Sequence, residues 1–383
     1  MAMHVLVIPS WYRSATSPQV GSFFREQAIA LAKAGCTVSL LYWYSDAKDK
    51  VYFEELDDEG VRTVLVHYKH SPYHINFLLQ RHYVMEAFRK FFKESPPDII
   101  HVHSFMATSY ARLLSRKYRI PYIVTEHSSA FARNLLTRRK KWIARRGFRA
   151  ARRVVAVSDG LKARIAPYCN KEPIVIPNMV SDSFFQQGAE EKMDCSSAQA
   201  APPFRFLSVG YLNRHKGMDL LIAAFAQLEK SYPHSELVIC GDGPEKESLK
   251  KQAADEGVAS CVTFTGNLSR QDVCRQMQQA QAFVLPSRFE TFGIVFIEAL
   301  ACGKPVIMAA TDASKTIVNE KNGFVVPLED IPALTESMQS LIDHYDRYDP
   351  GVIREDCRRR FSQQAVCQQI MAVYQEVLQN PRR

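Results

Sequence analysis

Short apolar runs alternate with helical patterns along this chain, and this alternation restricts its fold more than any other feature. In the first half the apolar runs occupy residues 5–8, 38–42, 99–102, 122–125, 154–157 and 174–176. Several are continuous and rich in β-branched residues, which is typical of strands with both faces covered. Repeated β-α-β units predict an α/β fold with a doubly wound parallel sheet.

The alternation is interrupted once, at residues 186–203, and then starts again. The interrupting segment, QQGAEEKMDCSSAQAAPP, is small and polar, and predicts a linker or exposed loop. Further apolar runs occupy residues 206–209, 237–240, 262–264, 283–285, 306–308 and 324–326. We therefore expect two α/β domains, residues 1–185 and 204–361, with ligands in a cleft at the carboxyl ends of the strands. A last helical stretch, residues 362–383, could cross back to the first domain.

The composition of the chain indicates the cellular compartment in which we expect it. No apolar run approaches the roughly 20 residues that a bilayer-spanning helix needs. The nine cysteines are scattered and form no Cys-x-x-Cys pair, which indicates a reducing compartment. We expect a cytoplasmic protein, at most peripheral at the inner face of a membrane.

The segment SRFETFGIVFIEALACGKPV, residues 287–306, contains the most specific pattern. It places Glu290 and Glu298 eight positions apart, with Gly293 where a helix should begin. The start of a helix offers free N–H groups and a partial positive charge, which suit a phosphate. The two carboxylates could then accept hydrogen bonds from hydroxyls on either side. A ligand with a central phosphate and hydroxyls at both ends is a nucleotide sugar.

The chain resembles the family 4 retaining glycosyltransferases, which have the GT-B fold of two Rossmann-like domains facing across a cleft. In the second half the resemblance rests on the segment 287–306 and on VGYLNRHKG (209–217), ICGDGPE (239–245), FTGNLSRQDV (264–273) and NGFVVP (322–327). In the first half it is looser, and rests on the loop at Gly21, TEH (125–127), VAVS (155–158) and IPN (176–178).

The resemblance implies roles for residues of the second half. Glu290 is expected to hold hydroxyls of the donor sugar, and Glu298 the ribose of the nucleotide. The backbone N–H groups of Phe292, Gly293 and Ile294 are expected to bind the diphosphate. The alternative is two surface carboxylates beside an ordinary helix start.

Two cations precede the expected helix that starts near residue 217. Lys216 and Arg214 could neutralise the leaving diphosphate as the glycosidic bond breaks. The family usually has an arginine directly after the strand glycine, where this chain has Tyr211. Arg214 is therefore either a substitute for that arginine or an exposed side chain.

In the first half, the resemblance places His127 near the reacting centre and the N–H of Gly21 near the donor phosphate. Both could instead be structural. His101 and His103, spaced to lie on one side of a strand, could be a metal pair, but no third ligand is evident and a packing role is the simpler interpretation. The chain contains neither Gly-x-Gly-x-x-Gly after a strand nor Asp-x-Asp. We expect no cofactor and no metal.

The positive charge is concentrated in one segment. Ten Lys or Arg and no Asp or Glu lie between residues 127 and 158, so the rest of the chain is close to neutral despite a net charge of +9. Apolar residues recur there at helical spacing, which predicts an amphipathic basic helix. It could contact an anionic membrane, bind an anionic soluble acceptor, or be a solvated face over the core. The candidate contact residues are Arg138, Arg139, Lys140, Lys141 and Trp142.

These patterns predict a glycosyltransferase that moves a sugar from a nucleotide-diphosphate donor, a UDP-sugar or alternatively a GDP-sugar, to an acceptor hydroxyl with retention. The expected acceptor is a glycan or a lipid-linked saccharide of bacterial polysaccharide or glycolipid assembly. An epimerase or inverting transferase of the same architecture remains an alternative, as does a non-catalytic basic protein that binds a membrane or nucleic acid. No nucleic-acid recognition motif is present, so we expect no nucleic-acid partner.

Overall fold

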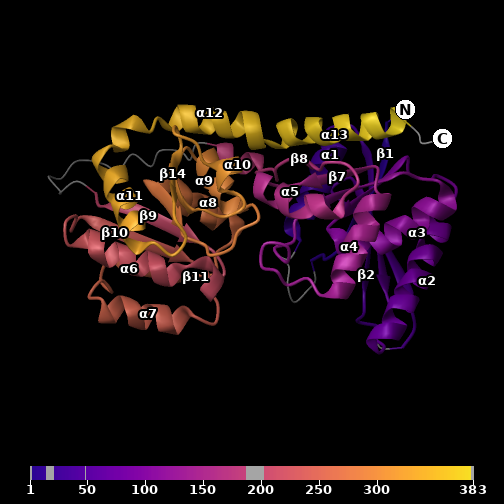
Figure 1. Ribbon diagram of the computed structural model, residues 1–383, viewed down its shortest axis with the longest axis horizontal. Helices are drawn as coiled ribbons and strands as arrows, with labels where there is room; N and C mark the ends of the chain where they lie inside the picture. The colour runs from indigo at the N-terminus through magenta and orange to yellow at the C-terminus, as the bar shows by residue number, and fades with distance from the viewer. Residues whose placement is uncertain (1, 14–20, 48, 187–201, 381–383) are drawn as a thin grey trace. The chain divides into compact units, whose positions relative to one another are not determined.

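The computed structural model describes residues 2–13, 21–47, 49–186 and 202–380 (Figure 1). They form two compact units. Unit 1 comprises Met1–Val157, Leu161–Ile176 and Gln363–Arg383, and unit 2 comprises Ser158–Gly160 and Pro177–Ser362. Most of the expected linker, residues 186–203, lies outside the described residues.

Unit 1 is built on one eight-stranded sheet. Its strands are β1 (His4–Pro9), β2 (Thr37–Tyr44), β3 (Tyr52–Asp58), β4 (Val61–His67), β5 (Ile99–His103), β6 (Tyr122–Glu126), β7 (Arg153–Ala156) and β8 (Ile174–Val175). Their order in the sheet is β3-β4-β2-β1-β5-β6-β7-β8. Neighbouring strands are parallel except β3, which runs antiparallel to β4. The predicted doubly wound parallel sheet is confirmed, with an unpredicted antiparallel strand at one edge.

Helices flank this sheet and include the end of the chain. They are α1 (Ser22–Lys33), α2 (Tyr73–Phe91), α3 (Thr108–Tyr118), α4 (Arg138–Ala150), α5 (Asp159–Ile165) and α13 (Gln363–Gln379), with the 3-10 turns η1 (Phe105–Ala107) and η2 (Ala166–Tyr168). Helix α13 packs against α1. The C-terminal segment therefore belongs to the same compact unit as the first strand.

Unit 2 is also built on a single sheet, which has six strands and is fully parallel. Its strands are β9 (Phe204–Val209), β10 (Ser235–Cys240), β11 (Val262–Gly266), β12 (Ala282–Leu285), β13 (Val306–Ala309) and β14 (Gly323–Val326). Its helices are α6 (Met218–Glu229), α7 (Lys246–Asp255), α8 (Arg270–Gln279), α9 (Ile294–Ala301), α10 (Ser314–Ile317), α11 (Ile331–Asp343) and α12 (Pro350–Phe361), with 3-10 turns η3 (Asp182–Phe185), η4 (Arg214–Lys216) and η5 (Tyr345–Arg347).

The strand order of unit 2 locates its ligand-binding edge. The order is β11-β10-β9-β12-β13-β14, so the chain proceeds from β9 in one direction and from β12 in the other. Right-handed crossovers in opposite directions place their helices on opposite faces of the sheet. The loops that follow β9 and β12 separate there and leave a crevice, where open α/β sheets bind their ligands.

Candidate functional site

The loops after β9 and β12 converge in unit 2. The first contains η4, and the second leads from Pro286 to Gly293. Lys216 Nζ donates a hydrogen bond to Glu290 Oε2 at 2.7 Å, and the two side chains are 25% and 13% exposed. Two motifs separated by 74 residues in sequence thus form one ion pair at the edge where such sheets bind ligands.

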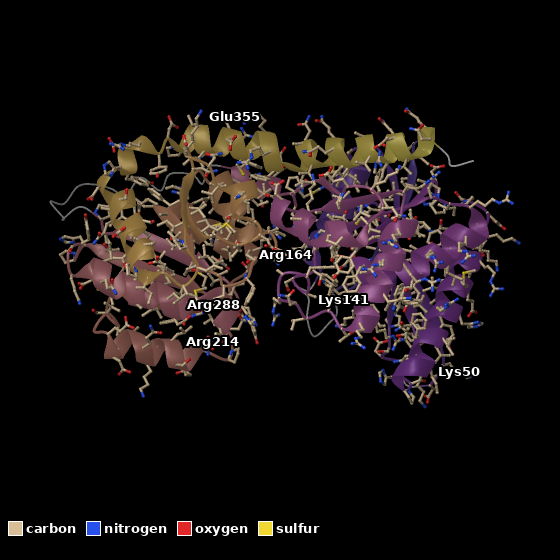
Figure 2. All side chains as sticks on the ribbon, in the orientation of Figure 1. Lys50, Lys141, Arg164, Arg214, Arg288 and Glu355 are labelled. Carbon is tan, nitrogen blue, oxygen red and sulfur yellow. The ribbon has the colours of Figure 1, made fainter. Side chains whose placement is uncertain are left out.

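Arg288, labelled with Arg214 in Figure 2, links these two loops through its side chain. Its guanidinium donates to both carboxylate oxygens of Asp219, at 2.8 and 2.7 Å, and to the carbonyl of Arg214 at 2.7 Å. A further ion pair at 2.8 Å links it to Glu329. Bidentate pairs of this kind fix geometry as well as charge. Arg288 was not among the residues predicted from the sequence, although it lies two residues before Glu290.

Two glycines shape the loops because their backbones are left-handed and crowded. Gly217 has φ 69°, and a Cβ there would lie 2.2 Å from the carbonyl oxygen of Pro286. Gly293 has φ 82° and immediately precedes α9, and a Cβ there would lie 2.7 Å from a ring carbon of Phe296. Both positions therefore require glycine.

Helix α9 begins at Ile294, as predicted. The N–H groups of Phe292, Gly293 and Ile294 have no hydrogen-bond acceptor among the described residues. They lie at the positive end of the helix and are available to an anion. Phe292 itself is buried, so its side chain anchors this turn in the core.

Glu298 lies further along α9 and is buried. Its Oε1 accepts a hydrogen bond from Arg270 Nη2 at 2.8 Å. Arg270 begins α8, whose N-cap is Ser269, and its guanidinium lies over the ring of Phe184 at 5.4 Å. Arg270 was not among the residues predicted from the sequence, although the motif FTGNLSRQDV contains it.

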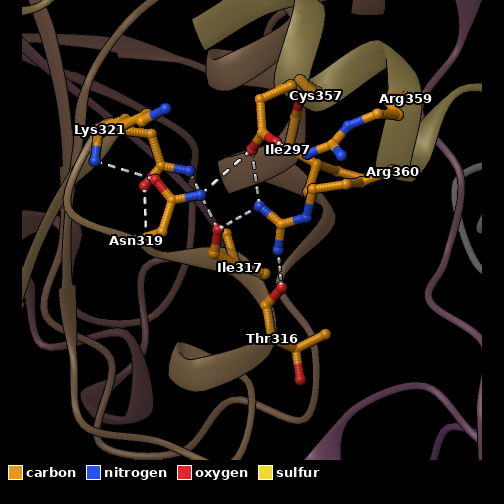
Figure 3. A network of polar contacts seen from close by, with 10 residues as sticks. Ile297, Thr316, Ile317, Asn319, Lys321, Cys357, Arg359 and Arg360 are labelled. Atoms are coloured by element: carbon orange, nitrogen blue, oxygen red, sulfur yellow. Dashed lines mark hydrogen bonds and ion pairs between the residues drawn. The ribbon is translucent and has the colours of Figure 1, made fainter.

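A polar network joins α12 to the middle of α9 and to α10 (Figure 3). Cys357 Sγ, on α12, donates to the carbonyl of Ile297 at 3.3 Å. On the same helix, Arg360 donates to the carbonyl of Ile317 at 3.2 Å and pairs with Asp356 at 2.9 Å. Helix α12 therefore holds both α9 and the end of α10.

Arg214, the candidate substitute cation, has no side-chain hydrogen bond to Lys216 or Glu290 among the described contacts. The side chain of Arg214 is exposed and has no ion-pair partner among the described residues. Tyr211 is 61% exposed. The structure thus brings Lys216 and Glu290 together. Arg214 takes part only through its backbone carbonyl, which accepts a hydrogen bond from Arg288.

In unit 1, His127 follows β6 and is buried beside other histidines. His127 Nε2 and His103 Nδ1 are 3.1 Å apart. Burial lowers the pKa of His127 to about 3, so the ring is neutral at neutral pH. The ring of Phe24, on α1 three residues after Gly21, lies 5.1 Å from the ring of His127. Gly21 itself has φ 72° and caps α1.

His101 contacts two hydroxyls: its Nδ1 lies 2.6 Å from Tyr374 Oη and its Nε2 lies 2.7 Å from Thr125 Oγ1. It therefore packs within a buried polar network. Across the described ranges, no group of three or more His, Cys, Asp or Glu is arranged to hold a metal ion.

The carboxylate of Glu126 organises the loop that carries His127. Its Oε1 accepts from the Ser104 hydroxyl at 2.6 Å and from the N–H groups of His127 and Ser128 at 3.0 and 2.7 Å. Its Oε2 accepts from the N–H of Phe105 at 2.8 Å. Burial raises the pKa of this carboxyl to about 7, against the lowering effect of these hydrogen bonds. The TEH motif thus contains a second important residue that the sequence analysis did not assign.

The basic segment forms α4, capped by the Thr137 hydroxyl. Its apolar side is packed in unit 1 through Ala144, Gly147 and Phe148. Trp142 remains 57% exposed among the cations. The remaining predicted contact residues, all on the exposed side, are Arg138, Arg139, Lys140 and Lys141. No described helix is both long and apolar enough to cross a bilayer.

Comparison with known proteins gives relatives over most of the chain. It is 24% identical over 367 residues to a glycogen synthase of Mycobacterium tuberculosis, covering 89% of this chain and 86% of the relative. It is 36% identical over 135 residues to a GDP-mannose-dependent alpha-(1-6)-phosphatidylinositol monomannoside mannosyltransferase of Mycolicibacterium smegmatis, covering 33% and 35%.

Among solved structures, Anabaena HepE in complex with UDP and glucose superposes with a TM-score of 0.74 at 19% identity, covering 98% of this chain and all of the other. This likeness shows the GT-B fold. Sequence profiles of two families match the two halves, "Glycosyltransferase Family 4" at residues 20–184 and "Glycosyl transferases group 1" at residues 190–364. The chain therefore belongs to the family 4 glycosyltransferases.

Proposed function

We propose that this glycosyltransferase moves a sugar from a nucleotide-diphosphate donor to an acceptor hydroxyl, with retention of the anomeric configuration. The observation that carries the proposal is the Lys216–Glu290 pair at the crevice between the loops that follow β9 and β12. The free N–H groups at the start of α9 belong to the same loop as Glu290. A cation, a carboxylate and a helix start at one crevice match the phosphates and hydroxyls of a nucleotide sugar.

Each group has a role in this proposal. Lys216 neutralises the charge that develops on the leaving diphosphate, while the N–H groups of residues 292–294 hold its oxygens. Glu290, released from Lys216, accepts hydrogen bonds from hydroxyls of the donor sugar. Glu298 accepts from the ribose, and Arg270 orients its carboxylate. In unit 1, neutral His127 contributes a hydrogen bond near the reacting centre, and the Gly21 N–H faces the donor phosphate.

The similar proteins support a donor of this class, because they include one solved in complex with UDP and a GDP-mannose-dependent enzyme. They also support a glycan or lipid-linked acceptor, and thus a role in polysaccharide or glycolipid assembly. We propose that no metal or cofactor takes part, since Lys216 and the helix start can hold the diphosphate. Undiminished turnover in EDTA tests this point.

The proposal is tested with a panel of UDP-, GDP- and ADP-sugars, measuring donor hydrolysis and transfer. NMR of the released sugar or product gives the anomeric configuration. Hydrolysis of one donor class, abolished by Glu290→Ala, is the expected result. An inverted anomer would refute retention, and donor epimerisation without transfer would favour the epimerase alternative.

A further inference from the structure

Unit 1 contains two adjoining cavities that its sequence motifs did not reveal. The larger, of about 440 Å³, lies among α2, α3 and α4. The smaller, of about 340 Å³, lies at the carboxyl ends of β1 and β2. Gln80, Met106 and Tyr110 line both, so the two cavities share a wall.

The larger cavity is rich in arginine. Its four basic residues are Arg81, Arg112, Arg139 and Arg146, and none of the described residues lining it is acidic. Burial lowers the pKa of Arg112, and the charges of Arg146 and Arg116 lower it further. Arg112 is partly buried and the other three are exposed, so four like charges lie together at one place and favour an anion among them.

Two partly buried arginines elsewhere in unit 1 have carboxylate partners. Arg25 pairs with Asp58 at 2.5 Å, and Arg62 pairs with Glu55 at 2.6 Å. In the described part of the chain, by contrast, no carboxylate pairs with Arg81, Arg112 or Arg146. The first turn of α3 also lines the cavity through residues 108–110, so a helix start adds to its positive potential.

Apolar surfaces lie beside these charges. Trp142 and Ile143 form one wall and Phe77 another. The guanidinium of Arg146 lies 4.4 Å from the centroid of the Trp142 ring, which keeps it over an aromatic face. A group that is anionic on one side and apolar on the other would match both kinds of surface.

The smaller cavity has a different character. Its walls are mainly aromatic, from Tyr42, Trp43, Tyr44 and Tyr68, with the Ser10 hydroxyl among them. Strands β1 and β5 are neighbours in the sheet. The chain continues from β1 to β2 on one side of this pair and from β5 to β6 on the other, and the cavity lies where these connections separate. Aromatic rings with polar groups beside them, at the place where the strand connections separate, suit a sugar ring.

We propose that the two cavities form one acceptor site, in which the smaller holds a sugar ring and the larger holds a phosphate or pyrophosphate attached to it. The acceptor class is thus a glycosyl phosphate or pyrophosphate. This identification of the acceptor rests on the proposed function, but the binding itself does not.

The test compares two double variants of equal charge. Arg112→Gln with Arg146→Gln removes two cavity arginines. Arg145→Gln with Arg149→Gln removes two exposed arginines of α4 outside the cavity. Thermal unfolding first establishes that both variants are folded. Calorimetry then measures binding of glucose 1-phosphate, farnesyl diphosphate and glucose, each with the nucleotide site saturated by UDP.

Both phosphate probes should bind the wild type more tightly than glucose. The cavity pair should weaken their binding by about tenfold or more, as expected for lost charge-assisted hydrogen bonds. The control pair should change it by less than about twofold. Because Trp43 and Trp142 are two of the three tryptophans of the chain, binding should also change the intrinsic fluorescence.

Equal weakening by the two pairs would overturn the proposal, since it would indicate general electrostatic attraction. No binding of either phosphate probe would overturn it as well. Binding only to phosphatidylglycerol vesicles, and not to the probes, would mean that α4 contacts a membrane surface instead. Probe binding without turnover of any nucleotide sugar would refute the proposed function while leaving the phosphate site intact.

Discussion

At the scale of the residue, a Lys216 variant can distinguish an effect on donor binding from an effect on the chemical step. If its ammonium stabilises the charge that develops on the leaving diphosphate, its removal affects the transition state more than the ground state. Lys216→Ala should therefore lower kcat more than it raises the donor KM. Lys250→Ala, which removes an exposed lysine paired with Glu247 at 3.1 Å, is the control and should leave both constants unchanged. A change in KM alone would mean that Lys216 only binds the donor.

Glu298 combines a proposed ligand contact with an internal ion pair. Glu298→Ala should weaken nucleotide binding by about 1–3 kcal/mol, the range for a lost hydrogen bond to a charged group. It should also lower stability, because Arg270 then loses the partner that it has at 2.8 Å. Arg270→Ala should reproduce part of the affinity loss if the pair orients the carboxylate. Calorimetry with UDP and GDP measures both, and unchanged affinity in Glu298→Ala would reject the ribose contact.

Glu126 should make the stability of unit 1 depend on pH. Burial raises its pKa to about 7 in the folded state, well above the usual carboxyl value. Between these two values the folded state binds more protons than the unfolded state, so the free energy of unfolding falls as pH rises. The stability of the wild type relative to Glu126→Gln should therefore decrease from about pH 5 to 7 and then stay level. Urea unfolding of both proteins across this range measures the difference, and parallel profiles would contradict the assignment.

At the scale of the element, the start of α9 depends on one glycine. Gly293→Ala introduces both a left-handed alanine and a contact of 2.7 Å with Phe296. Gly257→Ala is a matched control, since Gly257 has φ 79° and nothing within 4 Å of its added Cβ. The control should lose about 1–2 kcal/mol for the backbone alone. Gly293→Ala should lose more and also weaken donor binding. Equal losses, measured by urea unfolding, would mean that the contact relaxes freely.

The strands and helices that could be predicted from the sequence are those whose own residues form a recognisable pattern. Strand β1 is a continuous buried run, and the start of α9 is marked by Gly293. Strand β3 was missed because YFEELDD is largely polar and mostly faces solvent at the sheet edge. Pairing with β4 provides hydrogen bonds for its backbone N–H and carbonyl groups, but no alternating apolar pattern in its sequence predicts the strand.

The candidate site was predictable only in part for a related reason. Glu290, Glu298 and Lys216 were found from motifs. Arg270 and Arg288 were not, because their roles arise from partners 28 and 69 residues away in sequence. Only the order of the strands brings such partners together. The two cavities of unit 1 likewise combine residues of separate helices, and no short motif encodes them.

At the scale of the whole molecule, the chain ends in the unit where it began. Helix α13 buries Val366, Cys367, Ile370, Val373, Tyr374 and Val377 in unit 1. Full burial of each larger apolar side chain contributes about 1.5–3 kcal/mol, and a whole domain has a net stability of only about 5–15 kcal/mol. Unit 1 should therefore not fold stably without this helix, although its sheet lies entirely in residues 4–175.

A chain that ends at Ser362 tests this dependence. Unit 2 should keep its cooperative thermal transition and its binding of UDP or GDP, because all its residues remain. Unit 1 should lose its transition in calorimetry. Tyr374→Phe is the milder companion: it keeps the packing but removes the hydroxyl that lies 2.6 Å from His101. It leaves a buried ring nitrogen of His101 without this partner, so it should cost about 1–3 kcal/mol and leave both transitions visible. Two unaltered transitions in the truncated chain would show that α13 only covers unit 1 and does not hold it together.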